Sequence, residues 1–585
     1  MTADPVPLRS THRWWKEAVV YQIYPTSFQD SNGDGIGDIP GIISRLDYLK
    51  SLGVDVLWLS PVYKSPLKDM GYDISDYLAI DPRYGTMEDI EKLISGCHQR
   101  GMKLLMDLVV NHTSEEHAWF MESRKDKIND KRDWYIWRNP KIGPNGERIP
   151  PNNWRAVFGG SAWDLDETTQ QYYLHCFLPS QPDLNHENHL VRSAVHRVMD
   201  FWLKKGVDGF RQDVINLISK APGLPDAPIT FPDQFLQPAY PLFSNGPRLH
   251  EFLKEMRTAV LSRYDTMTVG EMPWCTDKEE VLRCVGEDRG ELDMIFQFDI
   301  IEMDFGPAGR FTDASEPWTL KTLRDIIEGW QSFMIQNSGW NSIAIESHDQ
   351  PRSVTRFFPE DLYPGNEDRE RRAKMMATLC AAQSGTLFMF QGQEIGMQNI
   401  PTSWDIDDYK DIETKNAYQL AKEKGHLEQF WNAARLKARD NGRTPVQWDG
   451  TENAGFTKGS PWMRVNDDYK EWNVEEQVKK EGSVWSFWKN VLEVRKKYRG
   501  VLVYGGFEML DKKSEDVLAW RREGEGKQAL VVMNWKEGPV TWKVPEKAQG
   551  VVKEENVRLK NYGEVKIGEG EIMLSKWEAV LFVDE

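Results

Sequence analysis

Two carboxylates, Asp213 and Glu271, are of the residue type that cleavage of a glycosidic bond requires. In that reaction one carboxylate acts as nucleophile or base, and the other must hold a proton at neutral pH. Arg211 stands two residues before Asp213, so in a strand both side chains point to the same side. A guanidinium there lowers the pKa of Asp213, which predicts Asp213 as nucleophile and Glu271 as acid. The spacing leaves a second interpretation open, a buried Arg211–Asp213 ion pair with Glu271 incidental.

Short apolar runs that end in polar residues predict the strands that position these side chains. Helical segments at 41–52, 87–100, 190–205 and 371–383 lie between several of the runs. Apolar strands alternating with helices predict a parallel sheet covered by helices, and eight such strands predict an α/β protein with a (β/α)8 TIM barrel. Polar strand ends, including those at Asp107, Glu271 and Asp349, would then meet at the C-terminal face of the barrel. The eight predicted strands are 19–24, 54–59, 103–110, 209–214, 266–270, 294–298, 342–345 and 386–390.

Three further segments complete the predicted organisation. Residues 112–184 are rich in Trp, Asn, Pro and Gly and too long for a plain loop, which predicts an inserted subdomain after strand 3. A second insertion at about 400–448 follows the eighth strand. Strand-like runs at 501–504, 517–521, 528–534, 540–544 and 579–583 predict a C-terminal antiparallel β domain, a β-sandwich, over 499–585. The barrel itself would comprise residues 1–111 and 185–498.

The composition excludes several functional classes. The 585 residues include 73 Lys+Arg and 91 Asp+Glu, a net charge of −18, whereas binding nucleic acid or an anionic membrane needs a basic face. The apolar runs are short, and Met1–Trp15 has no apolar core, so neither a membrane span nor a secretory leader is expected. Five cysteines without a CxxC pattern predict reduced thiols and a cytoplasmic location, not a disulfide framework or a zinc module.

Six motifs occur in an order that resembles glycoside hydrolase family 13, the α-amylase family, and within it the oligo-1,6-glucosidase, isomaltase and maltase branch of α-glucosidases. The resemblance implies Asp213 as nucleophile, Glu271 as general acid/base and Asp349 as a third carboxylate that steadies the sugar ring. It also implies a retaining mechanism, with Arg211, His112 and His348 binding hydroxyls of the glucose. The motifs are DLVVNH at 107–112, QPDLN at 181–185, GFRQDVIN at 209–216, VGEMPW at 269–274, ESHDQ at 346–350 and QGQEIG at 391–396.

Residues 69–72 (DMGY) resemble the segment that closes the glucose pocket in this branch. Tyr72 would stack on the sugar ring, and Asp69 would pair with Arg439 at the far end of the pocket. A closed pocket implies an exo-acting enzyme that releases single glucoses from chain ends. Phe177 would form a further wall. Simpler interpretations remain open. Asp69 and Arg439 could form a surface ion pair of little energetic value, and Phe177 could be an ordinary core residue.

The residue after the nucleophile implies a linkage preference. In this branch it tends to be Val in enzymes that prefer α-1,6 links, and Thr or Ala in those that prefer α-1,4 links; here it is Val214. The expected substrates are isomaltose and isomaltooligosaccharides, with an α-1,4-glucosidase acting on maltose or sucrose as the alternative. A sugar isomerase or transglucosylase is a further option, and Val214 could also be simple barrel core. Ser347 and Gln212 depart from the usual Asn and Met or Ile, which would alter hydrogen bonding in the pocket.

A non-catalytic relative that partners membrane transporters is the remaining class. It would require a membrane span and lost catalytic carboxylates, and the sequence offers neither.

Residues 30–38 place oxygen-bearing side chains at alternate positions around a glycine turn. The loop is not an EF-hand, because its twelfth position is Gly41 and not Glu. The branch binds Ca²⁺ at the matching loop, which implies a structural Ca²⁺ site, with Mg²⁺ as an alternative and no organic cofactor. An Asp/Asn/Gly turn that holds only water stays open. The implied ligands are Asp30, Asn32, Asp34, the Ile36 carbonyl and Asp38.

Overall fold

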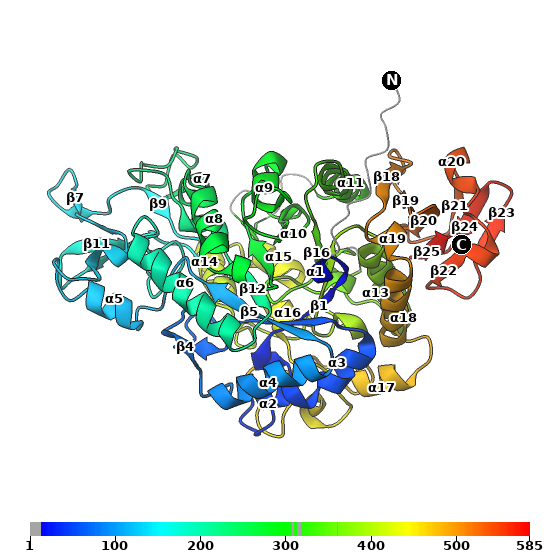
Figure 1. Ribbon diagram of the computed structural model, residues 1–585, viewed down its shortest axis with the longest axis horizontal. Helices are drawn as coiled ribbons and strands as arrows, with labels where there is room; N and C mark the ends of the chain where they lie inside the picture. The colour runs from blue at the N-terminus through cyan, green and yellow to red at the C-terminus, as the bar shows by residue number, and fades with distance from the viewer. Residues whose placement is uncertain (1–12, 307–308, 313–316, 360) are drawn as a thin grey trace. The chain divides into compact units, whose positions relative to one another are not determined.

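The computed structural model describes residues 13–306, 309–312, 317–359 and 361–585, so the segment assessed above for a secretory leader lies largely outside the described residues (Figure 1). The chain forms two compact units. The first comprises Met1–Leu57, Arg100–Met102 and Asp299–Glu585, and the second comprises Trp58–Gln99 and Lys103–Phe298.

The second unit contains four parallel strands in the order β15-β14-β12-β5. Almost every residue in them is buried, as expected of strands that are covered on both faces. The register places Arg211 beside Asp107 of β5 and Val269 of β14. Gly209, at φ 148°, permits this close pairing, because a Cβ there would lie 1.9 Å from the Met267 carbonyl oxygen. The strands are β5 (Lys103–Val109), β12 (Gly209–Asp213), β14 (Met267–Glu271) and β15 (Met294–Phe296).

Amphipathic helices alternate with these strands along the chain. In α6 the buried residues Val191, Val195, Val198 and Trp202 recur at helical spacing and form one apolar stripe. The Asn188 side chain caps this helix by accepting a hydrogen bond from the Leu190 amide. The helices are α4 (Met87–Gln99), α6 (His189–Lys204), α8 (Leu249–Ala259) and α9 (Lys278–Val285).

The segment between β5 and α6 forms its own small antiparallel sheet, in the order β10-β11-β6, drawn in cyan in Figure 1. Its many aromatic residues are mainly core: Phe120, Trp134, Trp137 and Tyr173 pack together in one buried cluster. The inserted subdomain after strand 3 is therefore present, while its predicted bounds, 112–184, stay a prediction. The elements include α5 (Ala118–Ser123), β6 (Trp137–Arg138), β7 (Lys141–Ile142), β8 (Arg148–Ile149), β9 (Trp154–Arg155), β10 (Trp163–Asp166) and β11 (Gln171–Leu174).

The first unit contains three further parallel strands in the order β1-β17-β16. With β2 (Val56–Leu59), which has residues in both units, they complete the eight strands of the (β/α)8 fold that the sequence predicts. Gly53, at φ 111°, ends α3 in the left-handed conformation that favours glycine. The elements are β1 (Val19–Ile23), β16 (Ser342–Ile343), β17 (Thr386–Phe390), α2 (Ile39–Ser44), α3 (Leu46–Leu52), α11 (Leu320–Gln336) and α13 (Asn366–Ala381).

The insertion after the eighth strand is helical. Trp404 and Phe430 belong to its buried core, together with Ile400 and Ala434. The helices are α14 (Ile412–Lys424), α15 (Leu427–Lys437) and α16 (Asp440–Arg443).

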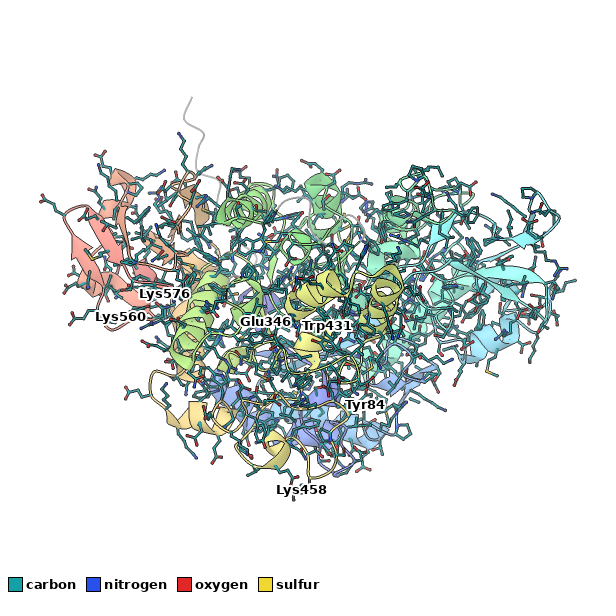
Figure 2. All side chains as sticks on the ribbon, turned by 180° about the vertical axis from the view of Figure 1, so that it is seen from behind. Tyr84, Glu346, Trp431, Lys458, Lys560 and Lys576 are labelled. Atoms are coloured by element: carbon teal, nitrogen blue, oxygen red, sulfur yellow. The ribbon has the colours of Figure 1, made fainter. Side chains whose placement is uncertain are left out.

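The C-terminal part, drawn in orange and red in Figure 1, is built on antiparallel sheets, as predicted, with the short helix α20 (Glu546–Gln549) between β21 and β22. Leu530, Trp542, Ile572 and Phe582 form one buried core shared by its two sheets. Lys576, labelled in Figure 2, lies 2.8 Å from Asp368 of α13. The five-stranded sheet contains β18 (Gly506–Leu510), β19 (Val517–Gly524), β20 (Lys527–Asn534), β25 (Ala579–Val583) and β22 (Val557–Lys560), and the three-stranded sheet contains β21 (Val540–Lys543), β24 (Glu571–Leu574) and β23 (Lys566–Gly568).

One predicted strand is wrong. Residues 501–504 were expected to be extended, but Val501 and Leu502 lie in the helix α19 (Arg499–Leu502), and the first strand of the domain begins only at Gly506. Val501, Leu502 and Val503 of this run are apolar and buried. Its pattern therefore cannot distinguish a buried strand from a buried helical turn.

Candidate active site

Three carboxylates of the second unit converge on one arginine. Arg211 Nη1 lies 2.8 Å from Asp107 Oδ1 and 2.6 Å from Asp213 Oδ1, and its Nη2 lies 2.7 Å from Glu271 Oε2. The parallel register of β5, β12 and β14 brings these residues to the same end of neighbouring strands. One guanidinium cannot balance three negative charges, so the cluster favours retaining protons.

Burial decides the protonation of this cluster. It raises the pKa of Asp213 to about 7, although the Arg211 charge acts in the opposite direction. It likewise raises the pKa of Asp107 to about 6. Arg211 therefore lowers the pKa of Asp213, as predicted, but the sequence did not reveal that desolvation outweighs it and leaves the net pKa raised. Asp213 and Glu271 contact the two terminal nitrogens of the same guanidinium, so the two carboxyl groups lie side by side.

Val214 has an unusual backbone conformation for a β-branched residue, with φ 34° and ψ 43°. This left-handed turn directs its amide to Glu271 Oε2 at 3.0 Å, the same oxygen that Arg211 contacts. Two donors on Oε2 favour an acidic proton on Oε1. The Val214 side chain packs in the apolar cluster that includes Trp154 and Phe243, which agrees with the core interpretation without excluding a role toward substrate.

The structure also brings together the sugar-binding residues predicted in this unit. His112 Nε2 lies 3.2 Å from the Tyr72 carbonyl oxygen, and the ring centroids of His112 and Phe177 are 5.2 Å apart. Gln181 Nε2 donates to Asp69 Oδ2 at 2.9 Å and lies 3.2 Å from His112 Nε2. Burial lowers the pKa of His112, so its imidazole stays neutral at neutral pH.

Two contributors to this group were not predicted as site residues. Asp107 shares Arg211 and also accepts a hydrogen bond from the Tyr72 hydroxyl at 3.2 Å. Gln181 bridges Asp69 and His112. Both stand in the motifs quoted above, and Asp107 was also predicted to lie at the C-terminal face of the barrel.

The first unit holds a second polar group around Asp349. Asp349 Oδ1 accepts from Arg443 Nη2 at 2.8 Å and Arg439 Nη1 at 3.2 Å. Both arginines also contact Asp411 Oδ1, Arg439 at 2.6 Å and Arg443 at 3.3 Å. Arg439 therefore has carboxylate partners within its own unit. The predicted Asp69–Arg439 pair would join the two units and stays a prediction.

His348 is held beside this group. Gln22 Nε2 lies 2.7 Å from His348 Nδ1, and the Tyr24 ring stacks on the imidazole at 6.0 Å. The Ser347 departure has a visible consequence, because the Ser347 hydroxyl accepts a hydrogen bond from the Asp349 amide at 3.1 Å. Glu346, labelled in Figure 2, accepts from the Ser353 amide at 2.9 Å and so fixes the same turn.

Hydrogen bonds organise the predicted metal loop. Asp30 Oδ1 accepts from the Asn32 and Gly33 amides at 2.9 and 2.7 Å, and Asp34 Oδ1 accepts from the Ile36 amide at 2.9 Å. Asp38 caps α2 by accepting from the Gly41 amide at 2.6 Å. The oxygen donors suit a hard cation such as Ca²⁺. Among the described residues the acidic oxygens of this loop do not form a group of three within 4.8 Å of one another, so Ca²⁺ binding stays a prediction.

Within the described ranges, no helix combines the length and apolarity that crossing a membrane requires.

Comparison with known proteins agrees with this arrangement. The sequence-family model of the α-amylase catalytic domain matches residues 22–505 of this chain. An α-glucosidase of Schizosaccharomyces pombe is 46% identical over 575 residues, 97% of each chain, and an oligo-1,6-glucosidase of Parageobacillus thermoglucosidasius is 48% identical over 572 residues, 97% of this chain and 98% of its own. The isomaltulose synthase SmuA from Protaminobacter rubrum has a similar structure, with a TM-score of 0.91, 40% identity and coverage of 98% of this chain and 100% of that one. The chain belongs to the α-amylase family of glycoside hydrolases, with the family's (β/α)8 catalytic barrel.

Proposed function

We propose that this glycoside hydrolase is a retaining, exo-acting α-glucosidase that releases glucose from the non-reducing end of short α-glucosides and prefers α-1,6 links. The observation that carries the proposal is the pairing of Asp213 and Glu271 on one guanidinium. Retaining enzymes hold their carboxyl groups about 5–5.5 Å apart, whereas inverting enzymes leave about 6.5–9.5 Å for a water. Two carboxylates held by the same guanidinium support the shorter spacing of the retaining arrangement.

The proposed reaction has two steps. Ionised Asp213 attacks the anomeric carbon and forms a covalent glucosyl-enzyme, while Glu271 gives its proton to the departing glycosidic oxygen. Glu271 then takes a proton from water, the water oxygen bonds to the anomeric carbon, and Asp213 leaves with its electron pair. Arg211 stabilises whichever carboxylate is ionised. Asp349 serves as the third carboxylate, in contact with sugar hydroxyls.

Several features support the substrate class. The similarity to proteins named oligo-1,6-glucosidase and α-glucosidase supports short α-glucosides as substrates of this chain. Examples are isomaltose, isomaltooligosaccharides, maltose and sucrose. Val214 supports the preference for α-1,6 links, and the proposed pair Asp69–Arg439 supports attack at chain ends. Five buried free cysteines support a reducing, cytoplasmic location. A structural Ca²⁺ at residues 30–38 belongs to the same proposal.

The similarity to an isomaltulose synthase supports a sugar isomerase as the alternative function. In a sugar isomerase the glucosyl-enzyme is captured by another sugar and not by water, so the two activities differ in products and not in the first step. The non-catalytic class is not favoured, because Asp213, Glu271 and Asp349 are all present.

Product analysis by NMR tests the proposal. Isomaltose, maltose and sucrose are supplied in turn, and α-glucose is expected as the first product, because retention preserves the anomeric configuration. Asp213→Asn and Glu271→Gln should each abolish release while the far-ultraviolet circular dichroism is unchanged. Glu167→Gln, which alters an exposed carboxylate of the same unit, is the matched control. First release of β-glucose would refute the retaining mechanism, and isomerised disaccharides from sucrose would favour the alternative.

A further inference from the structure

Three different ligand types meet at a buried position away from the carboxylate cluster. His250 of α8, Cys284 of α9 and Glu291 of the segment before β15 are all buried, and one ligand atom of each lies within 4.8 Å of the others. The His250 Nδ1–Glu291 Oε2 distance is 2.7 Å, and the Cys284 Sγ–His250 Nδ1 distance is 4.0 Å. In the described part of the chain, this is the one group of three or more His, Cys, Asp or Glu residues with such spacing.

The surroundings orient each of these atoms. His250 Nε2 lies 2.9 Å from Glu280 Oε1, which leaves Nδ1 to face Cys284 and Glu291. A metal-bound histidine almost always donates its other ring N–H to a carboxylate in this way. Glu291 Oε1 faces Arg289 Nη2 at 3.3 Å, so Oε2 is the oxygen that faces His250.

We propose that His250 Nδ1, Cys284 Sγ and Glu291 Oε2 form a binding site for a borderline-soft divalent cation of the Zn²⁺ class. Tetrahedral Zn²⁺ with bonds of about 2.0–2.1 Å to N and O and about 2.3 Å to S separates its N and O ligands by about 3.3 Å and its S and N ligands by about 3.6 Å. The corresponding separations here, 2.7 and 4.0 Å, require each pair to adjust by only about half an ångström. Mixed N, S and O ligands select Zn²⁺ over Ca²⁺ or Mg²⁺, which prefer oxygen.

The charges suit a divalent ion. A Cys284 thiolate and the Glu291 carboxylate together balance a 2+ charge, and loading releases the thiol proton. Glu280 is balanced separately by Arg283 at 2.8 Å. Water is the candidate for the fourth ligand, so Cys284 supplies the thiolate of this site.

An ion here would join α8, α9 and the segment before β15. The helix α9 begins seven residues after Glu271, at Lys278, so the ion would anchor the segment that directly follows the acid/base strand. We expect it to stabilise the second unit without taking part in the reaction.

Cobalt spectroscopy on the full chain tests this site. The protein is stripped with a chelator, dialysed into CaCl₂ so that any oxygen-only site is filled, and titrated with Co²⁺. One equivalent should give a thiolate-to-Co²⁺ charge-transfer band and intense tetrahedral d–d bands, and Zn²⁺ should displace both. Cys284→Ser should abolish the charge-transfer band and His250→Gln should weaken binding at least tenfold. Cys380→Ser, which alters another buried free cysteine, should leave the spectrum unchanged.

A second measurement covers variants that fail to fold. X-ray absorption of the Zn²⁺-loaded parent chain should show at least one sulfur neighbour together with nitrogen or oxygen neighbours. Zn²⁺ should also raise the Tm of the parent chain and not of Cys284→Ser. The proposal is overturned if Co²⁺ gives no charge-transfer band in the parent chain, if the band survives in Cys284→Ser, or if bound Zn²⁺ has no sulfur neighbour.

Discussion

Replacing Arg211 with Gln removes the one cation that contacts Asp107, Asp213 and Glu271. The Gln side chain is shorter than that of Arg but is polar and can still donate hydrogen bonds, so the main change is the loss of the positive charge. Because Arg211 is buried and all three partners are carboxylates, we expect the cluster to compensate by holding more protons. The nucleophile, Asp213, is then protonated at pH values where the parent enzyme works.

The magnitude follows from the geometry. A unit charge about 4 Å from a carboxylate contributes about 4 kcal/mol at an effective dielectric constant of about 20. That energy corresponds to about 3 pKa units, so loss of Arg211 moves the pKa of Asp213 from about 7 toward about 10. Relaxation of the site reduces the shift, and we take about one unit as the minimum. At pH 7 the ionised fraction of Asp213 then falls from about one half to about one tenth or less.

The assay is the pH dependence of kcat/KM, which reports the free enzyme. In Arg211→Gln the acidic limb of the profile, where kcat/KM rises with pH, should shift to higher pH by at least about one unit. Part of the lost activity should therefore return as the pH is raised. Arg211→Lys keeps the charge but cannot reach three carboxylates as a fork, so it should show an intermediate shift. Arg248→Gln, which alters a half-buried arginine of the same unit outside the carboxylate cluster, is the control and should leave the limb in place.

An acidic limb that stays in place, or moves to lower pH, in Arg211→Gln would refute this reasoning. It would mean that Arg211 does not set the ionisation of Asp213, and that its contacts serve only to position the carboxylates.

Four further predictions follow from single residues. Neither polar atom of the buried Gln212 side chain has a hydrogen-bond partner among the described residues, so Gln212→Met should raise the free energy of unfolding by about 1–2 kcal/mol in urea titrations with unchanged kcat; a less stable variant would contradict this. Val214→Thr, which keeps the β-branched shape, should lower the isomaltose-to-maltose ratio of kcat/KM by about tenfold, and a parent enzyme that already favours maltose would refute the linkage assignment. Burial raises the pKa of Asp107 to about 6, so the stabilising contribution of its protonated form is full below about pH 4 and is lost as the pH rises through 6. The free energy of unfolding should therefore fall between pH 4 and pH 6 by about 2 kcal/mol less in Asp107→Asn than in the parent enzyme. Ca²⁺ added to the chelator-treated enzyme should raise the Tm of the parent but not of Asp30→Asn, and an unchanged parent Tm would refute Ca²⁺ binding at residues 30–38.

The strands of the barrel were predictable because each is a short apolar run ending in polar residues. The eight predicted runs all contain a strand, from β1 at Val19–Ile23 to β17 at Thr386–Phe390. The same criterion failed at residues 501–504, where an equally apolar run forms a helical turn. Local pattern therefore predicts elements well only where length and flanking residues also distinguish strand from helix.

The protonation of the site was less predictable than its residues. Sequence spacing places Arg211 on the same side as Asp213, but it does not reveal that Asp107 and Glu271 share the same guanidinium. That sharing depends on the register between strands far apart in sequence, and burial depends on the whole unit. For the same reason the contacts of Arg443 and Asp411 with the predicted residues Asp349 and Arg439 were not foreseen.

The left-handed turn at Val214 places two determinants of the enzyme in one residue. Its side chain stands where the proposed linkage preference is decided, while its backbone amide holds Glu271 Oε2. Any replacement must also accept φ 34°, a conformation that costs a β-branched residue on the order of 1–3 kcal/mol and glycine little. A change of residue 214 that retunes substrate choice will thus also alter how firmly the proton donor is aimed. Selectivity and rate are therefore expected to evolve together at this position, and attempts to engineer one should be screened for the other.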